Sequence, residues 1–391
     1  MARSRTLLLA GAGIGGLATA LALSKAGFRS VLFERDAKPD PAGAGIQLSP
    51  NATRALNEIG ALAPLMKRAI EPESLVVSNG INRALLAEMP LKSVMAEKFG
   101  SPYLVCLRPD LHETLLSLAS DHADIEIRYG ISIGDFAIHN RGITALAYKG
   151  TQAEEINGLA LIGADGIRSL SRLRLAPDAK PAASGFAAWR ALLPAGAMPD
   201  DCRRNEVRIW LGPGGHLVHY PAGDGSRINL VAVARDARTS ESWGEECSPS
   251  DILPFFAHWN EEPRAVLALA KQFRRWTLSD IDPMTVWTEG RATLLGDAAH
   301  AMMPFLAQGA AATLEDAAAL ASTMCEHEDV AVALRRYEGV RIARATRMQR
   351  EARKAGRAYH IGWPWWHARD AVLQRLGGAG LLKRNEWIYR G

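Results

Sequence analysis

The chain has 391 residues, enough for two to three domains that each bury a hydrophobic core. Hydrophobic residues make up 48% of it, charged residues make up 23%, and the mean hydropathy is −0.06, which excludes disordered and fibrous classes. The formal net charge is +4, from 46 basic and 42 acidic residues, which is too small an excess to indicate a nucleic-acid partner.

The cysteines lie far apart, and none stands in a pair or near a histidine at metal-ligand spacing: Cys106, Cys202, Cys247 and Cys325. We therefore expect no metal site and a reducing compartment. An apolar run over residues 7–23 imitates a secretion signal, but four glycines interrupt it. No other stretch approaches the roughly 20 apolar residues that a membrane span requires, so we expect a cytoplasmic protein without a span.

The first stretch with a recognisable pattern is a nucleotide-binding motif. The apolar run 6–10 predicts a buried parallel strand and leads directly into G-x-G-x-x-G at residues 11–16. A compact helix to about Lys25 and a second strand over 30–33 follow. This order predicts a βαβ unit of a Rossmann-like fold.

The residues of this motif have separate tasks in such a unit. Gly11 permits the tight turn, Gly13 lets the backbone approach a pyrophosphate, and Gly16 lets helix and strand pack closely. Glu34, about 20 residues after Gly11, is placed to accept hydrogen bonds from ribose hydroxyls, and Arg35 follows it. The unit alone does not separate FAD from a nicotinamide dinucleotide.

Two later segments repeat a strand-to-loop transition with an aspartate beside a glycine. The run 159–162 leads to Asp165, and the run 292–295 leads to Asp297. Such an acidic side chain suits a polyol like the ribityl chain of a flavin, although each aspartate alone is equally well explained as a helix cap or turn former. An alanine-rich helix expected over 310–320 would direct its positive amino end at the same site.

The three segments, with GIQLSPN at 45–51 and RPDL at 108–111, resemble the single-component FAD-dependent aromatic hydroxylases, the group A flavoprotein monooxygenases. The resemblance covers essentially the whole chain. It is strongest to the salicylate hydroxylase and 3-hydroxybenzoate 6-hydroxylase branch, which shares the stretch GDAAH at 296–300 and an ending like the WIY at 387–389. The chain departs from many relatives at Ala301, where they have proline, but it keeps Pro304.

The resemblance implies FAD as the cofactor and NADH or NADPH as a transient co-substrate. It places Glu34 on the adenosine ribose, Arg108 along the cofactor and Asp297 on the ribityl hydroxyls, while Asp165 supports the second motif. The cofactor-binding residues expected are Gly11, Gly13, Gly16, Glu34, Arg35, Gly45, Ile46, Arg108, Asp165, Gly296, Asp297, Pro304, Gln308, Gly309 and Ala310.

Residues 184–285 differ in pattern from the nucleotide-binding segments. They consist of short strand-like runs separated by glycine-rich turns. We expect an antiparallel sheet inserted into the nucleotide fold, covering the cofactor and leaving an apolar pocket between the domains. The predicted fold is α/β, with a discontinuous Rossmann-like FAD-binding domain at 1–75, 103–183 and 286–330, a substrate-binding sheet at 76–102 and 184–285, and a C-terminal helical region at 331–391.

Alternation within the expected strand 216–221 puts His216 and Tyr220 on one face and Leu217 and His219 on the other. We expect His219 to face the aromatic ring and act as a base, because an imidazole with a pKa of about 6.5 accepts a phenolic proton at neutral pH. The resemblance also implies a histidine base on this strand. The alternative is a hydrogen-bonded or exposed strand histidine.

The other catalytic residue expected is Pro304, and the further substrate contacts expected are Arg190, Leu217, Met302 and Phe305. Arg190 can hold a substrate carboxylate through a forked contact, or it can pair with an acidic neighbour. Met302 and Phe305 suit an apolar wall at the flavin edge and suit a plain core equally well. We expect His300 to orient the cofactor loop.

The predicted function is hydroxylation of a phenolic aromatic compound of the hydroxybenzoate type. NAD(P)H would reduce FAD, O2 would add to give a flavin hydroperoxide, and its terminal oxygen would attack the ring. The alternatives are a flavin-dependent oxidase or reductase on a non-aromatic substrate, a non-catalytic flavoprotein that sequesters an aromatic ligand, and a nicotinamide-dependent dehydrogenase. We expect a small aromatic substrate and O2 as partners, no nucleic acid, and a monomer or homodimer.

Overall fold

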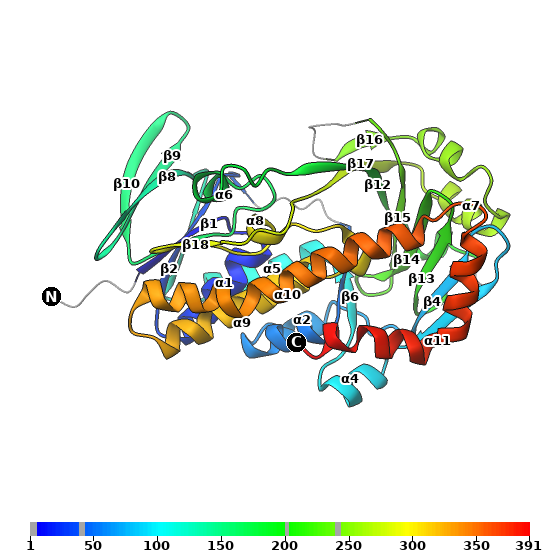
Figure 1. The fold of residues 1–391 in the computed structure, drawn as a ribbon, viewed down its shortest axis with the longest axis horizontal. Helices are drawn as coiled ribbons and strands as arrows, with labels where there is room; N and C mark the ends of the chain where they lie inside the picture. The colour runs from blue at the N-terminus through cyan, green and yellow to red at the C-terminus, as the bar shows by residue number, and fades with distance from the viewer. Residues whose placement is uncertain (1–5, 39–43, 200–202, 239–243) are drawn as a thin grey trace.

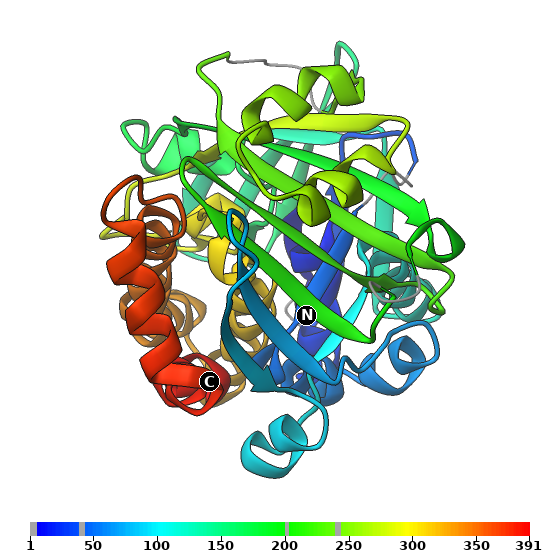
Figure 2. The same cartoon turned by 90° about the vertical axis from the view of Figure 1, so that its right-hand side faces the viewer.

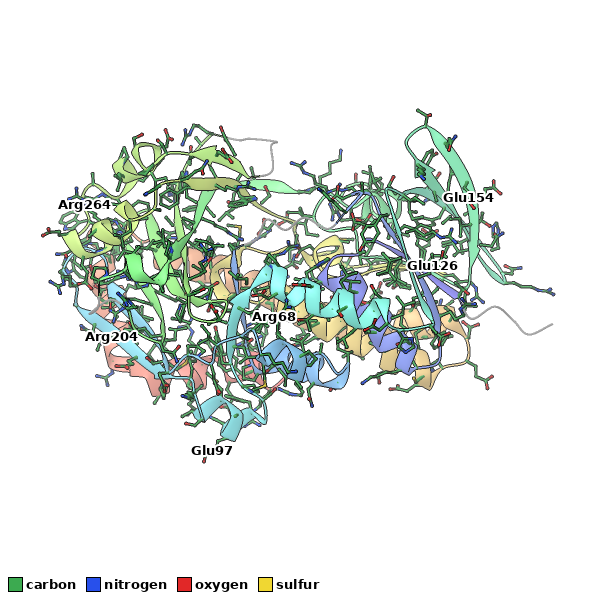
Figure 3. All side chains as sticks on the ribbon, turned by 180° about the vertical axis from the view of Figure 1, so that it is seen from behind. Arg68, Glu97, Glu126, Glu154, Arg204 and Arg264 are labelled. Carbon is green, nitrogen blue, oxygen red and sulfur yellow. The ribbon has the colours of Figure 1, made fainter. Side chains whose placement is uncertain are left out.

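The computed structural model describes residues 6–38, 44–199, 203–238 and 244–391. Two β-sheets occupy the two ends of an elongated molecule, and the long helix α10 (Val330–Tyr359) runs from one toward the other (Figure 1). Charged side chains such as Glu126, Glu154 and Arg264 project outward from the surface (Figure 3).

The first sheet has six strands within the described ranges. Their order is β18 (Thr288–Glu289), β19 (Ala292–Leu294), β11 (Leu161–Gly163), β1 (Thr6–Ala10), β2 (Arg29–Glu34) and β7 (Ile125–Tyr129). All neighbours run parallel except β18 and β19. In this register Ala10 lies beside Gly163, which lies beside Leu294. The three predicted motifs therefore leave the sheet side by side at the carboxyl ends of adjacent strands, where α/β proteins bind ligands.

Helices cover this sheet as the apolar runs predict. α1 (Ile14–Lys25) packs against α5 (Arg108–Ser120) and α9 (Gly309–Glu326), and α9 packs against α10. The mostly small and aliphatic side chains of α1 are buried, and together with the parallel strands they form the largest hydrophobic core. The predicted nucleotide-binding fold is confirmed.

An antiparallel meander extends from the first sheet, and sequence analysis did not foresee it. It consists of β8 (Ser132–His139), β9 (Gly142–Lys149) and β10 (Gln152–Gly158), and it packs against β1 and β2 through a separate apolar core (Figure 1). The short helix α6 (Leu170–Leu175) lies beside it.

In the part of the chain that the structure describes, the second sheet has eight strands. Their order is β16 (Glu245–Cys247), β17 (Phe273–Asp280), β12 (Ala182–Pro194), β15 (Arg227–Arg235), β14 (Gly215–Ala222), β13 (Glu206–Gly212), β4 (Ser74–Asn79) and β5 (Leu85–Pro90). Neighbouring strands are antiparallel as predicted, except that β4 joins β13 in parallel. One face is covered by α7 (Glu261–Ala268) and by the turns η3 (Pro249–Asp251) and η4 (Leu253–Phe256), as Figure 2 shows. We call this the outer face; the inner face is turned toward the nucleotide fold.

The remaining short elements are β3 (Gly45–Leu48) paired with β6 (Leu104–Leu107), α2 (Pro50–Glu58), α3 (Leu62–Met66), α4 (Val94–Phe99), η1 (Ala195–Ala197), α8 (Asp297–His300) and η5 (Pro304–Leu306). The C-terminal helical segment is confirmed, with α10 followed by α11 (Trp366–Tyr389) along β5. None of the helices in the described ranges has the length and apolar character that crossing a bilayer needs.

Candidate active site

The glycine motif is tight where the fold needs it and open where a ligand would approach. A Cβ on Gly16 would lie 2.0 Å from the carbonyl oxygen of Gly11, so helix and strand meet there without room for a side chain. A Cβ on Gly13 would meet no heavy atom within 4 Å. Gly11 itself has a φ of +101° and its Cβ would lie 2.5 Å from the Ala164 carbonyl oxygen, which joins the first motif to the second.

Glu34 stands beside this motif, at the end of β2. Its carboxylate accepts hydrogen bonds from the backbone N–H of Ala12 at 2.9 Å and of Asp36 at 3.1 Å. The side chain is therefore held against the glycine turn, where an adenosine ribose would lie in a Rossmann-like site. Arg35 is exposed. That Glu34 and Arg35 bind the cofactor stays a prediction.

In the second motif, the carboxylate of Asp165 forms hydrogen bonds within the protein. Its carboxylate accepts hydrogen bonds from the Ser169 hydroxyl at 2.5 Å and from the Ser171 backbone N–H at 3.0 Å, which fixes the start of α6. Arg172, which no sequence pattern predicts as a site residue, is buried and donates from Nη1 to the Ala298 carbonyl at 3.1 Å. This arginine ties the second motif to the third.

Asp297 is the exposed member of the third motif, whereas the three residues after it in α8 are buried. The surrounding protein removes hydration from its carboxyl and raises its pKa, while the positive charges of Arg108 and Arg172 oppose the shift. Asp297 thus offers an accessible acceptor that feels the positive charges of Arg108 and Arg172, which fits hydroxyl donors of a ribityl chain.

A buried ion network supports the loop that carries Asp297. Asp316 on α9 accepts hydrogen bonds from the Gly296 backbone N–H at 3.0 Å and from Arg341 Nε at 2.7 Å, and it lies 2.5 Å from His300 Nε2. Burial would raise the pKa of Asp316, but the charges of His300 and Arg341 outweigh it and lower that pKa. His300 therefore orients the loop, as expected from the sequence.

Gln308 joins this loop to the segment after β3. It is buried, donates to the Ser49 hydroxyl at 2.9 Å, and accepts from Asn51 Nδ2 at 3.1 Å. Asn51 Nδ2 also donates to Glu315 at 2.6 Å. The amide of Gln308 is thus engaged by protein on both sides, and its contact with a cofactor stays a prediction.

Segment 45–48 lies against the inner face of the second sheet. The Gly45 backbone N–H donates to Asn229 Oδ1 at 2.7 Å, and a Cβ on Gly45 would lie 2.7 Å from the Tyr220 ring. The inner face also carries Val218 and Val231, which pack with Leu306 of the loop that follows Pro304. The inner face and the loop 301–308, which we call the flavin loop, therefore meet through apolar side chains.

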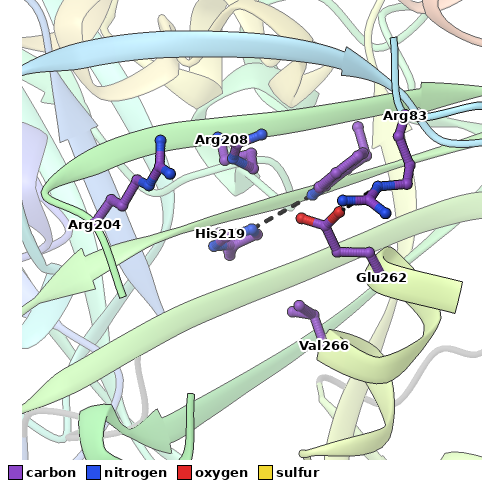
Figure 4. Close-up of a pocket in the computed structure, with 7 residues that line it drawn as sticks. Arg83, Arg204, Arg208, His219, Glu262 and Val266 are labelled. Carbon is purple, nitrogen blue, oxygen red and sulfur yellow. Dashed lines mark hydrogen bonds and ion pairs between the residues drawn. The ribbon is translucent and has the colours of Figure 1, made fainter. Parts of the chain in front are cut away.

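The expectation that His219 and Leu217 face the substrate is wrong. His219 lies on the outer face, in a cavity of about 230 Å³ lined by Arg83, Arg204, Arg208, Trp210, Glu262 and Val266 (Figure 4). Trp210 Nε1 donates to His219 Nε2 at 3.4 Å, and Leu217 belongs to the outer core. Burial and the charge of Arg208 lower the pKa of His219 to about 3. The expected alternation along β14 is present, but the face with His219 and Leu217 is the outer one.

His216 is the histidine on the inner face. Its ring centroid lies 5.5 Å from that of Phe305, in the loop after Pro304. Burial, and then the neighbouring His360, lower its pKa well below the ordinary value. Pro304 itself is exposed and Met302 is half-buried, while Phe305 is buried between the sheet and α10.

Arg190, also on the inner face, is half-buried, and none of the ion pairs found among the described residues includes it. Its guanidinium carbon lies 5.3 Å from the centroid of the Trp276 ring, and its Nε is buried without a partner among the described residues. Burial lowers its pKa, and the nearby Tyr220 opposes that shift. The alternative of an acidic neighbour for Arg190 finds no support in the described ranges.

These residues fit FAD. The backbone is open at Gly13 and again at Gly309, where α9 begins and a Cβ would meet nothing within 4 Å. Glu34 stands at the strand end, Asp297 is accessible, and the inner face of the sheet covers the region beyond. A Rossmann-like fold with this acceptor set and a covering sheet defines a flavoprotein with a substrate domain.

Comparison with known proteins identifies the family and the relatives of the chain. A family model described as "FAD binding domain" matches residues 4–352. The chain is 34% identical to 3-hydroxybenzoate 6-hydroxylase 1 of Aquipseudomonas alcaligenes, over 97% of this chain and 92% of that protein. It is also 34% identical to 3-amino-4-hydroxybenzoate 2-monooxygenase PtmB3 of Streptomyces platensis, over 97% and 94%. A solved salicylate hydroxylase substrate complex superposes with a TM-score of 0.84, at 26% identity and over 99% and 95% of the two chains.

The chain therefore belongs to the FAD-binding-domain family, in the branch that contains the 3-hydroxybenzoate 6-hydroxylases. It is an FAD-dependent aromatic-ring monooxygenase.

Proposed function

We propose that this enzyme hydroxylates the ring of a phenolic aromatic acid of the hydroxybenzoate type, with NADH or NADPH as reductant and O2 as the second substrate. The named relatives act on substituted hydroxybenzoates, which supports the class but leaves the particular acid open. When bound, FAD supplies the electron transfer and the oxygen chemistry. The protein supplies binding, orientation, exclusion of water and a place for a proton.

The observation that carries this proposal is the charge of Arg190 on the inner face. A guanidinium remains protonated even when half-buried, and burying it without a counterion is unfavourable. A substrate carboxylate can provide that counterion through two parallel hydrogen bonds. Asn229 contributes a second unsatisfied donor, since its Nδ2 is buried without a partner among the described residues.

His216 is the base in this proposal. Because its pKa is lowered, the imidazole is neutral at neutral pH and able to accept a proton. Its Nδ1 lies 2.7 Å from His360 Nε2, so Nε2 is the nitrogen left to accept the phenolic proton. Removing that proton raises the electron density of the ring carbon that is attacked.

The proposal includes a transiently bound nicotinamide, a cytoplasmic location, and a monomer or homodimer. Free thiols at Cys106, Cys247 and Cys325 support a reducing compartment. Cys202 lies outside the described residues.

A substrate panel tests the proposal. The FAD-loaded enzyme is given hydroxybenzoates, aminohydroxybenzoates, hydroxypyridine carboxylates and the matching phenols that lack a carboxylate, under labelled O2. We expect NAD(P)H oxidation to rise with carboxylated phenols, and one labelled oxygen atom to appear in the product by mass spectrometry. An oxidised product without label would identify an oxidase or reductase instead. Tight binding of the acids without NAD(P)H consumption would identify a sequestering flavoprotein.

A further inference from the structure

A second histidine, far away in sequence, contacts His216. His216 Nδ1 and His360 Nε2 lie 2.7 Å apart, and the two rings are nearly parallel, with an interplanar angle of 15°. His360 directly follows the last residue of α10, while His216 lies on β14. Both side chains are buried.

The backbone holds His360 in place from two sides. Its N–H donates to the Gly356 carbonyl at 3.1 Å, and its carbonyl accepts from the Gly214 N–H at 3.1 Å, one residue before β14. Phe186 packs on its ring, with centroids 4.7 Å apart, and Phe305 meets it edge-on at 5.3 Å. The position of His360 is thus fixed relative to the strand that carries His216.

The charged and titratable groups around the pair come from three elements. Arg235 of β15 and Arg369 of α11 both oppose protonation of His360, and Asp370 partly neutralises Arg369 at 2.7 Å. Tyr359 of α10 meets the His216 ring edge-on, with centroids 5.6 Å apart. Burial and these arginines lower the pKa of His360 to about 4, so both imidazoles are neutral at neutral pH.

Two neutral imidazoles can share one hydrogen in two ways. If His216 donates from Nδ1–H to His360, the Nε2 of His216 carries a lone pair and can accept a proton. If His360 donates instead, the Nε2 of His216 already carries a hydrogen and cannot serve as a base. The hydrogen bond to the second ring nitrogen thus decides whether a histidine acts as an acceptor.

We infer that His360 is a positioning residue for the proposed hydroxylation: it accepts a hydrogen bond from His216 Nδ1–H and so keeps His216 Nε2 free to take the phenolic proton. This inference rests on the proposed function. In the step itself, the O–H bond of the phenol breaks, an N–H bond forms at His216 Nε2, and no electrons are exchanged. Because His360 is itself uncharged at neutral pH, it does not repel the cationic His216, which then donates a stronger, charge-assisted hydrogen bond to it.

Two substitutions of His360 separate the hydrogen bond from packing. In His360→Gln the amide oxygen reaches the place of Nε2 and can accept from His216, whereas His360→Leu fills space without an acceptor. Removing a residue that orients a functional histidine lowers activity by about 10- to 100-fold. We therefore expect kcat for hydroxylation to fall at least about 10-fold in the Leu variant. The Gln variant should stay within about threefold of the wild type. KM and the FAD content should change little in both.

A spectroscopic readout does not depend on turnover. A nitro-substituted hydroxybenzoate, whose phenolate absorbs visible light, is titrated into each enzyme from pH 5 to pH 9. We expect the bound analogue to ionise at higher pH in the Leu variant than in the wild type and the Gln variant, and the acidic limb of kcat to shift in the same direction. If the Leu variant does not fold, His360→Asn replaces it, because the Asn amide is too short to reach His216.

Two results would overturn the inference: a Leu variant whose kcat profile and ionisation of the bound analogue equal those of the wild type, or a Gln variant as impaired as the Leu variant. Either result leaves the proposed function intact if the wild type hydroxylates aromatic acids. If the wild type incorporates oxygen into none of them, the proposed function fails first, and this inference fails with it.

Discussion

His216 and His219 stand on the same strand and face opposite sides of the sheet. The His216 ring meets Phe305 of the flavin loop at 5.5 Å, whereas His219 accepts a hydrogen bond from Trp210 in the outer cavity. Successive side chains of a strand alternate between its faces, so residues an odd number of positions apart cannot both reach one ligand. Only His216 is oriented toward the flavin loop.

This relationship predicts different outcomes for two alanine variants. His216→Ala should lower the rate of hydroxylation by about 100-fold or more, because general-base catalysis contributes about 10²- to 10⁴-fold. His219→Ala should keep most of the activity. Single-turnover product formation with the best acid of the panel measures both, and FAD absorbance serves as the control for cofactor retention. Equal losses in the two variants would contradict the assignment.

Arg190 should determine the preference for a carboxylate. Arg190→Met should raise KM for carboxylated phenols by about 10- to 100-fold, since a hydrogen bond to a charged group contributes about 1.5–3 kcal/mol. The matching phenols without a carboxylate should be affected little. Arg227→Met, at an exposed position on β15, is the control. A KM increase shared by acids and neutral phenols would assign Arg190 a structural role.

Substituting alanine for Gly13 and for Gly16 should have different effects on the protein. A Cβ at Gly13 meets no protein atom, and the residue has a φ of −73°, which alanine adopts readily. Gly13→Ala should therefore leave the Tm of the apoprotein within about 2 °C while weakening FAD binding at least about 10-fold. Gly16→Ala puts a Cβ 2.0 Å from the Gly11 oxygen, so it should destabilise the fold itself. Thermal melts and FAD titrations of the apoproteins test the pair, and FAD affinity unchanged in Gly13→Ala would contradict it.

The buried histidines should make the fold sensitive to mild acid. The pKa of His219 is about 3 in the folded protein and about 6.5 when unfolded, so between these values the unfolded chain binds a proton that the folded protein does not. The contribution of uncharged His219 to the free energy of unfolding is complete above pH 6.5. It is lost as the pH falls toward 3, at about 1.4 kcal/mol per pH unit. His219→Gln keeps an acceptor for Trp210 but does not titrate.

Urea unfolding at pH 7 and pH 5 measures this effect. Between pH 7 and pH 5, the free energy of unfolding should fall by about 2 kcal/mol more in the wild type than in His219→Gln. Identical losses in the two proteins would show that His219 is not protected from protonation.

Arg344 should hold the end of the chain to helix α9. It donates to the carbonyls of Trp387 and Ile388, both at 2.8 Å, and pairs with the buried Glu315 at 2.7 Å. Arg344→Met should lower the free energy of unfolding by about 2–3 kcal/mol, because it leaves Glu315 partly uncompensated. Arg350→Met, at an exposed position on the same helix, should stay within about 0.5 kcal/mol in the same denaturant titration. Equal stabilities would mean that Arg341 alone compensates Glu315.

The strands and glycines of the nucleotide fold could be predicted because local patterns determine them. The apolar run before Gly11 and the glycines at 11, 13 and 16 are compatible with few other local structures. The strand expected at 6–10 forms, and the one expected at 30–33 forms with one more residue at each end. The cap made by Asp165 was also among the alternatives drawn from the sequence. The meander of β8 to β10 and the buried Arg172 were not predicted. An arginine that bonds to the carbonyl of Ala298 gives no local signal, because its partner lies more than a hundred residues away.

The sequence by itself determined the two-residue alternation of β14, the three motifs and the acidic residues beside them, because backbone geometry and side-chain periodicity are local. Only the tertiary structure decided which face of β14 meets the flavin loop, since that depends on where α7 and α10 pack. It alone brought His360 to His216 and left the Nε of Arg190 buried without a partner among the described residues. Such pairings depend on long-range packing, and no pattern within a single segment records them.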